Sequence, residues 1–103
     1  MTHRLLVQYG QPADPRAFDE HYRDVHIPLA RKIPGLVRFT IAQPSPIGDG
    51  PAPYLVAELD FESEADFGAG LQSAEGQAAA RDVPNFATGG ASMSHFEVDD
   101  VTS

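Results

Sequence analysis

The chain has 103 residues, a formal net charge of −8 and no cysteine. A chain of this length forms one domain that buries roughly two-thirds of its unfolded surface without disulfides, and the absence of cysteine excludes thiolate catalysis and cysteine-ligated metal sites. Only seven lysines and arginines are present, and they are scattered, which argues against binding to nucleic acid or to an anionic membrane surface. We expect a soluble, cytoplasmic protein, because no apolar run reaches the length of a transmembrane helix or a signal peptide.

The first half of the chain predicts a strand, a helix and a second strand. Residues 4–9 alternate between two faces, as a strand does. Residues 15–33 form an amphipathic helix with Asp14 as its cap, because their apolar side chains recur at helical spacing. Residues 36–43 return to strand alternation, and residues 44–53, rich in Pro and Gly, form an irregular loop.

Pro28 interrupts the predicted helix next to His26. Proline removes a backbone N–H and crowds the carbonyl of Asp24, so a kink or a loosened turn is expected there. His26 lies at the edge of the apolar face, one turn after Tyr22. A titratable ring beside a tyrosine on an interrupted, inward-facing helix is typical of a functional site, and equally of a structural histidine in a core.

The second half predicts a strand, two helical pieces and a last strand. Residues 54–61 alternate again, and serines begin two consecutive helical pieces, of which the second covers residues 74–83. Residues 91–98 form the final strand, and residues 99–103 are a frayed acidic tail. No internal repeat or second domain is present, so residues 1–103 form a single domain.

The order of elements, β-α-β-β-α-β, predicts an α+β fold of the ferredoxin-like type. Right-handed crossovers place both helical regions on one face of a four-stranded antiparallel sheet. The first three strands carry apolar residues on both faces, so the other face also needs a cover. A second copy of the chain is the simplest closed solution, and we therefore expect a homodimer.

Two motifs, in order along the chain, point to a family. The first is Phe18-x-x-His21-Tyr22-x-x-x-His26-x-Pro28-Leu29, followed by Ile33-Pro34-Gly35. The second is Ser73-Ala-Glu-Gly76-Gln77-Ala-Ala-Ala-x-Asp82-x-x-Asn85-Phe86. Together they resemble the EthD (ethyl tert-butyl ether degradation) family, over nearly the whole chain.

The resemblance implies that the homodimer is a dimeric α+β barrel. This fold is shared with cofactor-independent monooxygenases, muconolactone isomerases and some polyketide cyclases. Members of the family are often labelled reductases. The chain, however, has no glycine-rich dinucleotide loop, flavin motif or metal cluster to carry redox chemistry, so no cofactor is expected.

The candidate catalytic residues are His26, which matches the family's histidine in the first helix, and Tyr22, which would orient it or bond a substrate oxygen. The candidate substrate-binding residues are Tyr9, Phe39, Phe86 and Arg38. Tyrosine and phenylalanine at these positions also fit a plain core, and the arginine also fits an ion pair with Glu58 at a dimer interface. Asp82 and Asn85 are predicted to be capping or loop-anchoring groups.

No metal is expected, although the chain has four histidines. No H-x-x-x-H pair with a carboxylate lies on one helix. His21 and His26 are five residues apart and are predicted to face away from each other, with His21 at the surface or an interface. His3 and His95 fall on edge or terminal segments.

These features predict a cofactor-free catalyst that transfers a proton next to a carbonyl of a small aromatic, lactone or polyketide-like metabolite in catabolic or secondary metabolism. It would be an isomerase, a cyclase or a monooxygenase-like enzyme. The alternative is a non-catalytic accessory protein that binds a hydrophobic metabolite or a partner enzyme. Both hypotheses need an apolar pocket. They differ in whether the protein transfers a proton to or from the bound molecule.

Overall fold

The sheet has the predicted ferredoxin-like topology. The computed structural model describes residues 1–103. Its strands are β1 (Thr2–Tyr9), β2 (Leu36–Ala42), β3 (Leu55–Phe61) and β4 (Ala91–Val98). They form one sheet in the order β2-β3-β1-β4, and every neighbouring pair is antiparallel. The α+β prediction is therefore confirmed.

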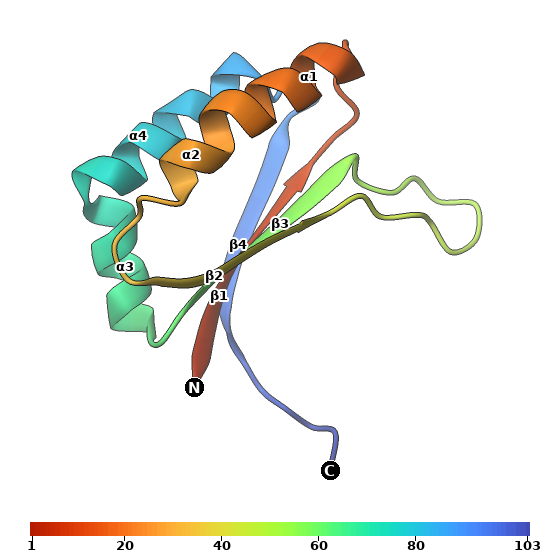
Figure 1. Ribbon diagram of the computed structural model, residues 1–103. Helices are drawn as coiled ribbons and strands as arrows, with labels where there is room; N and C mark the ends of the chain where they lie inside the picture. Colours follow the sequence, from red (N-terminus) through yellow and green to blue (C-terminus); the bar gives the residue numbers. More distant parts are fainter.

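Two helical regions cover one face of this sheet (Figure 1). The first consists of α1 (Pro15–His21), a π-helical turn η1 (Tyr22–His26) and α2 (Ile27–Ala30). The second consists of α3 (Glu64–Gln72), α4 (Ala74–Asp82) and a 3₁₀ turn η2 (Val83–Asn85). None of the helices has both the length and the hydrophobicity that crossing a membrane requires.

The caps of these helices explain where they begin. The Asp14 carboxylate accepts hydrogen bonds from the first turn of α1, and serine hydroxyls accept from the first turns of α3 and α4. The first helical region ends at Ala30, three residues before the predicted end at Ile33. Gly35 then takes a positive φ of 82°, which turns the chain into β2.

The π-helical turn lies where the proline was predicted to loosen the helix. Pro28 has no N–H to donate, and the N–H of Ile27 reaches the carbonyl of Tyr22, five residues back. Such a turn inserts one extra residue into the helix and shifts the faces of the segments before and after it. The prediction of an interruption beside His26 is confirmed, and its form is a π turn.

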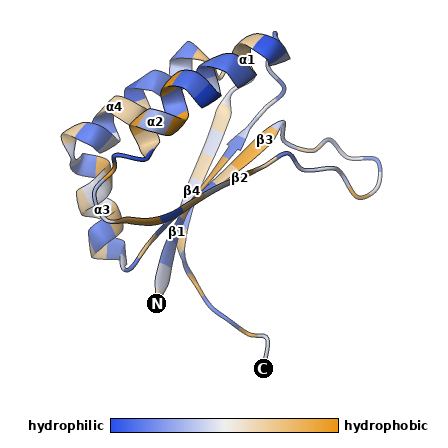
Figure 2. Cartoon of the chain, viewed as in Figure 1, coloured by the Kyte–Doolittle hydropathy of each residue, from blue (hydrophilic) through white to orange (hydrophobic).

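The core lies between the helices and the sheet. β1 and β3 alternate, and their helix-facing side chains are buried. Figure 2 shows apolar residues, in orange, on β3. Tyr9, Phe18, Tyr22 and Phe86 form an aromatic cluster in which every ring lies 5.1–5.7 Å from each of the others, centroid to centroid. This cluster joins β1, the first helical region and the end of the second.

The face of the sheet without helices carries apolar residues, as predicted, together with a cluster of charged ones. Leu6 and Val56 lie on it, but Arg4 lies beside them and donates to both carboxylate oxygens of Asp60, at 2.7 and 3.1 Å. Glu58 also pairs with Arg4, at 3.2 Å. Arg38 makes no ion pair within the protomer, so the suggested pair of Arg38 with Glu58 across a dimer interface stays a prediction.

The long connection between β2 and β3, residues 43–54, is irregular as predicted and projects from the body of the protein (Figure 1). Its inner end is fixed by the Tyr54 hydroxyl, which donates to Asp19 at 2.7 Å. Ile47 is fully exposed in the projecting part.

The junction of α3 and α4 depends on a glycine. Gly76 is buried in the first turn of α4, and a Cβ at this position would meet the backbone carbonyl oxygens of Gly70 and Leu71. Gly68, in the middle of α3, has open space around the same position. Replacing each of these two glycines by alanine therefore distinguishes the effect of close packing, at Gly76, from the effect of helix propensity, at Gly68.

We expect Gly76→Ala to destabilise the protein by about 1–3 kcal/mol, because backbone atoms must move to admit the methyl group. The control, Gly68→Ala, should stabilise it by roughly 0.4–1 kcal/mol, because alanine restricts the unfolded chain and favours a helix. Urea denaturation of the two variants and the wild type measures both effects. Equal stabilities for the two variants would show that α3 and α4 do not meet as described.

Candidate functional site

A buried carboxylate, that of Asp82, connects the two helical regions. Its Oδ2 accepts a hydrogen bond from His26 Nδ1 at 3.0 Å, and its Oδ1 accepts from His21 Nε2 at 2.8 Å. Asn85 Nδ2 donates to the same Oδ1 at 3.1 Å. Asp82 is the last residue of α4, where the helix dipole disfavours a negative charge, so these donors compensate for its position as well as its burial.

The prediction that His21 and His26 face away from each other is wrong, and the π turn is the reason. In an α-helix, residues five apart point about 140° from each other, at about 100° per residue. The turn η1, with its i→i+5 hydrogen bonding, brings residues five apart onto the same side. Both histidines therefore reach one carboxylate, and Asp82 is more than the cap or loop anchor that its position suggested.

The charges in this group are fixed by burial and hydrogen bonding. Burial raises the pKa of Asp82, but the bonds from His21, Asn85 and His26 outweigh it and hold this pKa below its ordinary value. Burial lowers the pKa of His26, and the bond to Asp82 opposes this only in part. Asp82 is thus ionised and His26 neutral near pH 7.

The tautomer of His26 follows from its partner. An ionised carboxylate only accepts, so Nδ1 carries the proton and Nε2 carries the lone pair. Nε2 makes no hydrogen bond within the protomer, and it is not among the fully buried unpaired atoms, so it keeps some accessible surface. The result is an oriented imidazole with its basic nitrogen free.

The hydroxyl of Tyr22 is buried and makes no hydrogen bond of good geometry, although the neighbouring Tyr9 hydroxyl is close enough to affect its pKa. Burial raises the pKa of Tyr22 and of the adjacent Tyr9, so both phenols stay protonated. An unpaired buried hydroxyl costs about 1–3 kcal/mol, which makes it unusual in a folded protein. A ligand oxygen that accepts from Tyr22 would remove this cost.

These groups border a small apolar cavity of about 60 Å³ between the helices and the sheet. Tyr9, Tyr22, His26 and Phe39, four of the predicted site residues, line it together. Fourteen of its sixteen lining residues are hydrophobic. The volume is well below the roughly 300–1,000 Å³ of ordinary ligand pockets, so a ring-sized ligand requires side chains to move.

The other two predicted residues lie elsewhere. Phe86 does not line the cavity but packs on His26, with ring centroids 4.7 Å apart, and so supports its position. Arg38 pairs in register with Asp60 on the face of the sheet away from the helices, so the structure does not bring it to the cavity.

Sequence reasoning missed three residues of this region: His21, Asp82 and Met93. Met93, on the edge strand β4, lines the cavity although its side chain is 54% exposed. The spacing H-x-x-x-x-H followed by a proline was the available signal for the histidines. Nothing local to Asp82 or Met93 indicates a contact with residues so far away in the chain.

Relatives were found in sequence and in structure. The uncharacterized 11.0 kDa protein in the thcB-thcC intergenic region of Rhodococcus erythropolis is 47% identical over 92 residues, which are 88% of this chain and 89% of that protein. The crystal structure of an EthD family protein from Bacillus halodurans has a TM-score of 0.86 and 34% identity, and the match covers 96% of this chain and 100% of that one.

Two more distant structures share the fold alone. SnoaB, a cofactor-independent oxygenase from Streptomyces nogalater, has a TM-score of 0.71 and 15% identity, over 98% of this chain and 96% of its own. A dimeric ferredoxin-like protein of unknown function from Thermobifida fusca has a TM-score of 0.72 and 15% identity, over 95% and 92%. The EthD domain model matches residues 10–90, most of the length of the chain. The protein belongs to the EthD family.

Proposed function

We propose that this protein is a cofactor-free catalyst in which His26 removes a proton from a small apolar substrate. The observation that carries the proposal is the state of His26: neutral, oriented by Asp82, and with Nε2 free beside an apolar cavity. A general base needs a free lone pair, a fixed direction and a pKa near or below the working pH. His26 meets these three conditions.

Tyr22 supplies the second half of the reaction. Removal of a proton from a carbon next to a carbonyl moves negative charge onto the carbonyl oxygen, which a positioned O–H donor stabilises. The unpaired hydroxyl of Tyr22 is such a donor, and it remains protonated. The ionised Asp82 stabilises the imidazolium of His26 that forms, as in other carboxylate–histidine pairs.

The substrate class follows from the cavity. Its lining is apolar apart from the tyrosines and His26, which suits an aromatic, lactone or polyketide-like molecule with one reactive carbonyl. The flexible side chain of Met93 lies between the cavity and solvent, and its displacement would make room for a ring. The description of SnoaB as a cofactor-independent oxygenase supports cofactor-free chemistry in this fold, by analogy only.

The test is proton exchange. In D₂O, the wild type should incorporate deuterium next to the carbonyl of at least one member of a panel of lactones and phenolic ketones, as measured by NMR. His26→Asn should bind the same compound, stay folded and lose roughly 10²- to 10⁴-fold in exchange rate, the usual contribution of a general base. The control, His21→Asn, removes a donor to the same carboxylate without touching the cavity and should change the rate far less.

Two outcomes would contradict this proposal. A folded His26→Asn variant with the wild-type rate would remove His26 from the chemistry. A wild type that binds members of the panel but exchanges no proton in any of them would favour the alternative, an accessory protein that binds a hydrophobic metabolite.

The state of His26 also predicts how stability changes with pH. Its folded-state pKa lies below the ordinary 6.5, so the unfolded chain binds a proton at this residue more readily than the folded one. The contribution of His26 to the free energy of unfolding should therefore be complete above pH 6.5. It should decrease as the pH falls from 6.5 through the pKa of His26 in the folded protein. His26→Asn should show a shallower decrease over that interval in urea denaturation. The same slope in both proteins would mean that His26 is not held neutral.

We further propose that the helix-free face of the sheet is covered by a second copy of the chain. Leu6 and Val56 lie on this face, and Phe96 of β4 is 40% exposed. Arg4 and Arg38 on this face match the two carboxylates of Glu58 and Asp60 in number, so the face as a whole carries no net charge when it is buried. The dimeric description of the Thermobifida fusca neighbour agrees with this arrangement.

Val56→Asp tests the dimer, because it places an unpaired charge on that face. The wild type should elute with twice the mass of one chain, and the variant should dissociate or lose several kcal/mol of stability, roughly the cost of an unpaired buried charge. Ala65→Asp, on the exposed side of α3, adds the same charge and should change neither. Light scattering coupled to size exclusion measures the mass. A folded, monomeric wild type at micromolar concentration would refute the dimer.

A further inference from the structure

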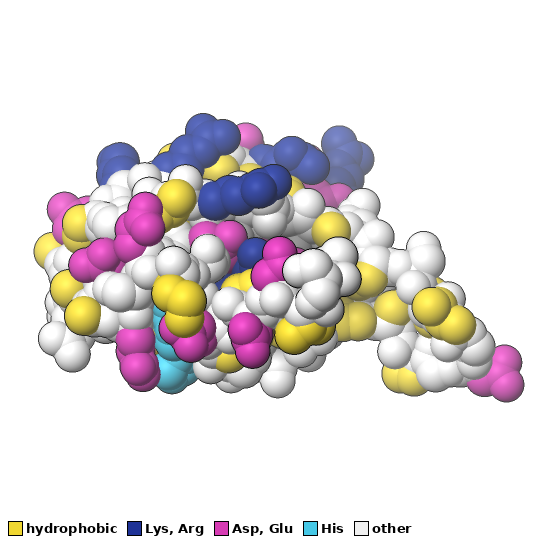
Figure 3. Space-filling view, turned by 90° about the horizontal axis from the view of Figure 1, so that it is seen from below, with side chains coloured by type: hydrophobic (Ala, Val, Ile, Leu, Met, Phe, Trp, Pro, Cys, Tyr) yellow, Lys and Arg dark blue, Asp and Glu magenta, His cyan; other side chains and the backbone are white.

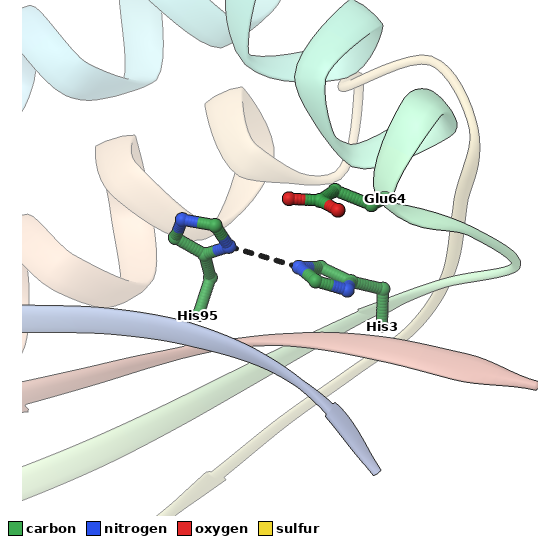
Figure 4. A group of neighbouring side chains, drawn as sticks. All are labelled: His3, Glu64 and His95. Atoms are coloured by element: carbon green, nitrogen blue, oxygen red, sulfur yellow. Dashed lines mark hydrogen bonds between the residues drawn. The ribbon is translucent and has the colours of Figure 1, made fainter.

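A second group of titratable residues lies apart from the cavity, at the opposite end of β1 from Tyr9. His3 is on β1, His95 is on the neighbouring strand β4, and Glu64 is the first residue of α3. Figure 4 shows the two imidazoles edge to edge on the sheet, with the Glu64 carboxylate above them. One potential ligand atom from each of the three lies within 4.8 Å of the others.

The distance between the two imidazoles matches a pair of metal ligands. His3 Nε2 and His95 Nδ1 are 2.9 Å apart, and they share one proton in a hydrogen bond. Two nitrogens bound to one Zn²⁺ at about 2.1 Å are roughly 3.4 Å apart at the tetrahedral angle. A divalent cation would therefore take the place of the shared proton after a shift of about half an ångström, and that proton would move to the other nitrogen of the ring that donated it.

The rings are already held in place. Phe67 of α3 packs against both, with centroid distances of 5.2 Å to His3 and 4.6 Å to His95. His3 is also buried, with 6% of its surface exposed. Ligand side chains that are fixed before binding lose less conformational entropy when the metal arrives.

The surroundings favour a cation. Glu62, Glu64 and Glu97 border the same open depression as the two histidines. In the space-filling view, histidine surface is flanked by acidic side chains, while the basic side chains gather on the other side of this view (Figure 3). The local excess of carboxylates attracts divalent cations to a site that remains open to solvent.

We propose that His3, His95 and Glu64 form a site for a divalent transition metal of the zinc type. Two imidazoles and one carboxylate are a common donor set for Zn²⁺, whereas Mg²⁺ and Ca²⁺ prefer oxygen ligands. Water completes the coordination, because the depression is open. This proposal departs from the expectation of no metal, which considered histidine pairs on one helix only; here two antiparallel strands bring the histidines together. It is independent of the proposed role of His26.

The experiment is a titration of untagged protein with ZnCl₂, followed by calorimetry and by thermal melting. The wild type should bind one Zn²⁺ per chain and melt at a higher temperature with Zn²⁺, because the ion connects β1, β4 and α3. A large excess of Mg²⁺ should not compete. His95→Asn, at an exposed position, should lose at least about 100-fold in affinity, more than the loss of an outer hydrogen bond costs.

A matched pair of variants separates ligation from general charge. Glu64→Gln should weaken Zn²⁺ binding, whereas Glu62→Gln removes the same charge from the same depression and should leave the affinity nearly unchanged. His26→Asn should also bind Zn²⁺ as the wild type does. No binding by the wild type at micromolar Zn²⁺, full binding by His95→Asn, or equal losses in the two glutamate variants would each overturn the proposed site.

Discussion

The candidate site depends on one missing hydrogen-bond donor. Because Pro28 has no N–H, the first helical region cannot continue as a regular α-helix, and the N–H of Ile27 bonds five residues back instead. The extra residue in that turn aligns His21 with His26, and both then reach Asp82 across the gap between the helical regions. An uninterrupted helix would leave one histidine in solvent and the buried carboxylate with fewer donors.

The hydrogen bonds to the Asp82 carboxylate explain why this polar group can lie beside the core without a large energetic cost. Asp82 is buried and at the unfavourable end of its helix, yet three side chains donate to it, so the group as a whole is satisfied. The hydroxyl of Tyr22 is not satisfied. An unpaired buried group is rare in a folded protein and calls for a reason such as a catalytic role or a bound molecule, so the contrast between Asp82 and Tyr22 is informative about function.

The fold could be predicted from the sequence because each strand and helix shows its own regular spacing of apolar residues. Alternation in residues 4–9 and 36–43, and helical spacing from residue 15 onward, depend only on neighbours in the chain. Tyr22 and His26 were found for the same reason. The partnership of His26 with Asp82 spans 56 residues, and that of Arg4 with Asp60 also spans 56, so neither follows from spacing. The alignment of His21 required knowing that the interruption is a π turn, which proline alone does not specify.

The aromatic cluster has a practical consequence. The chain has no tryptophan and three tyrosines. Tyr9 and Tyr22 belong to the cluster, and the ring of Tyr54 contacts Phe18 at a centroid distance of 5.0 Å. All the tyrosine absorption and fluorescence of the protein therefore arises in or against one group of rings beside the cavity. The tyrosine bands in the near-ultraviolet circular dichroism of the unmodified protein therefore report on the surroundings of that cavity, with no contribution from tyrosines elsewhere in the fold.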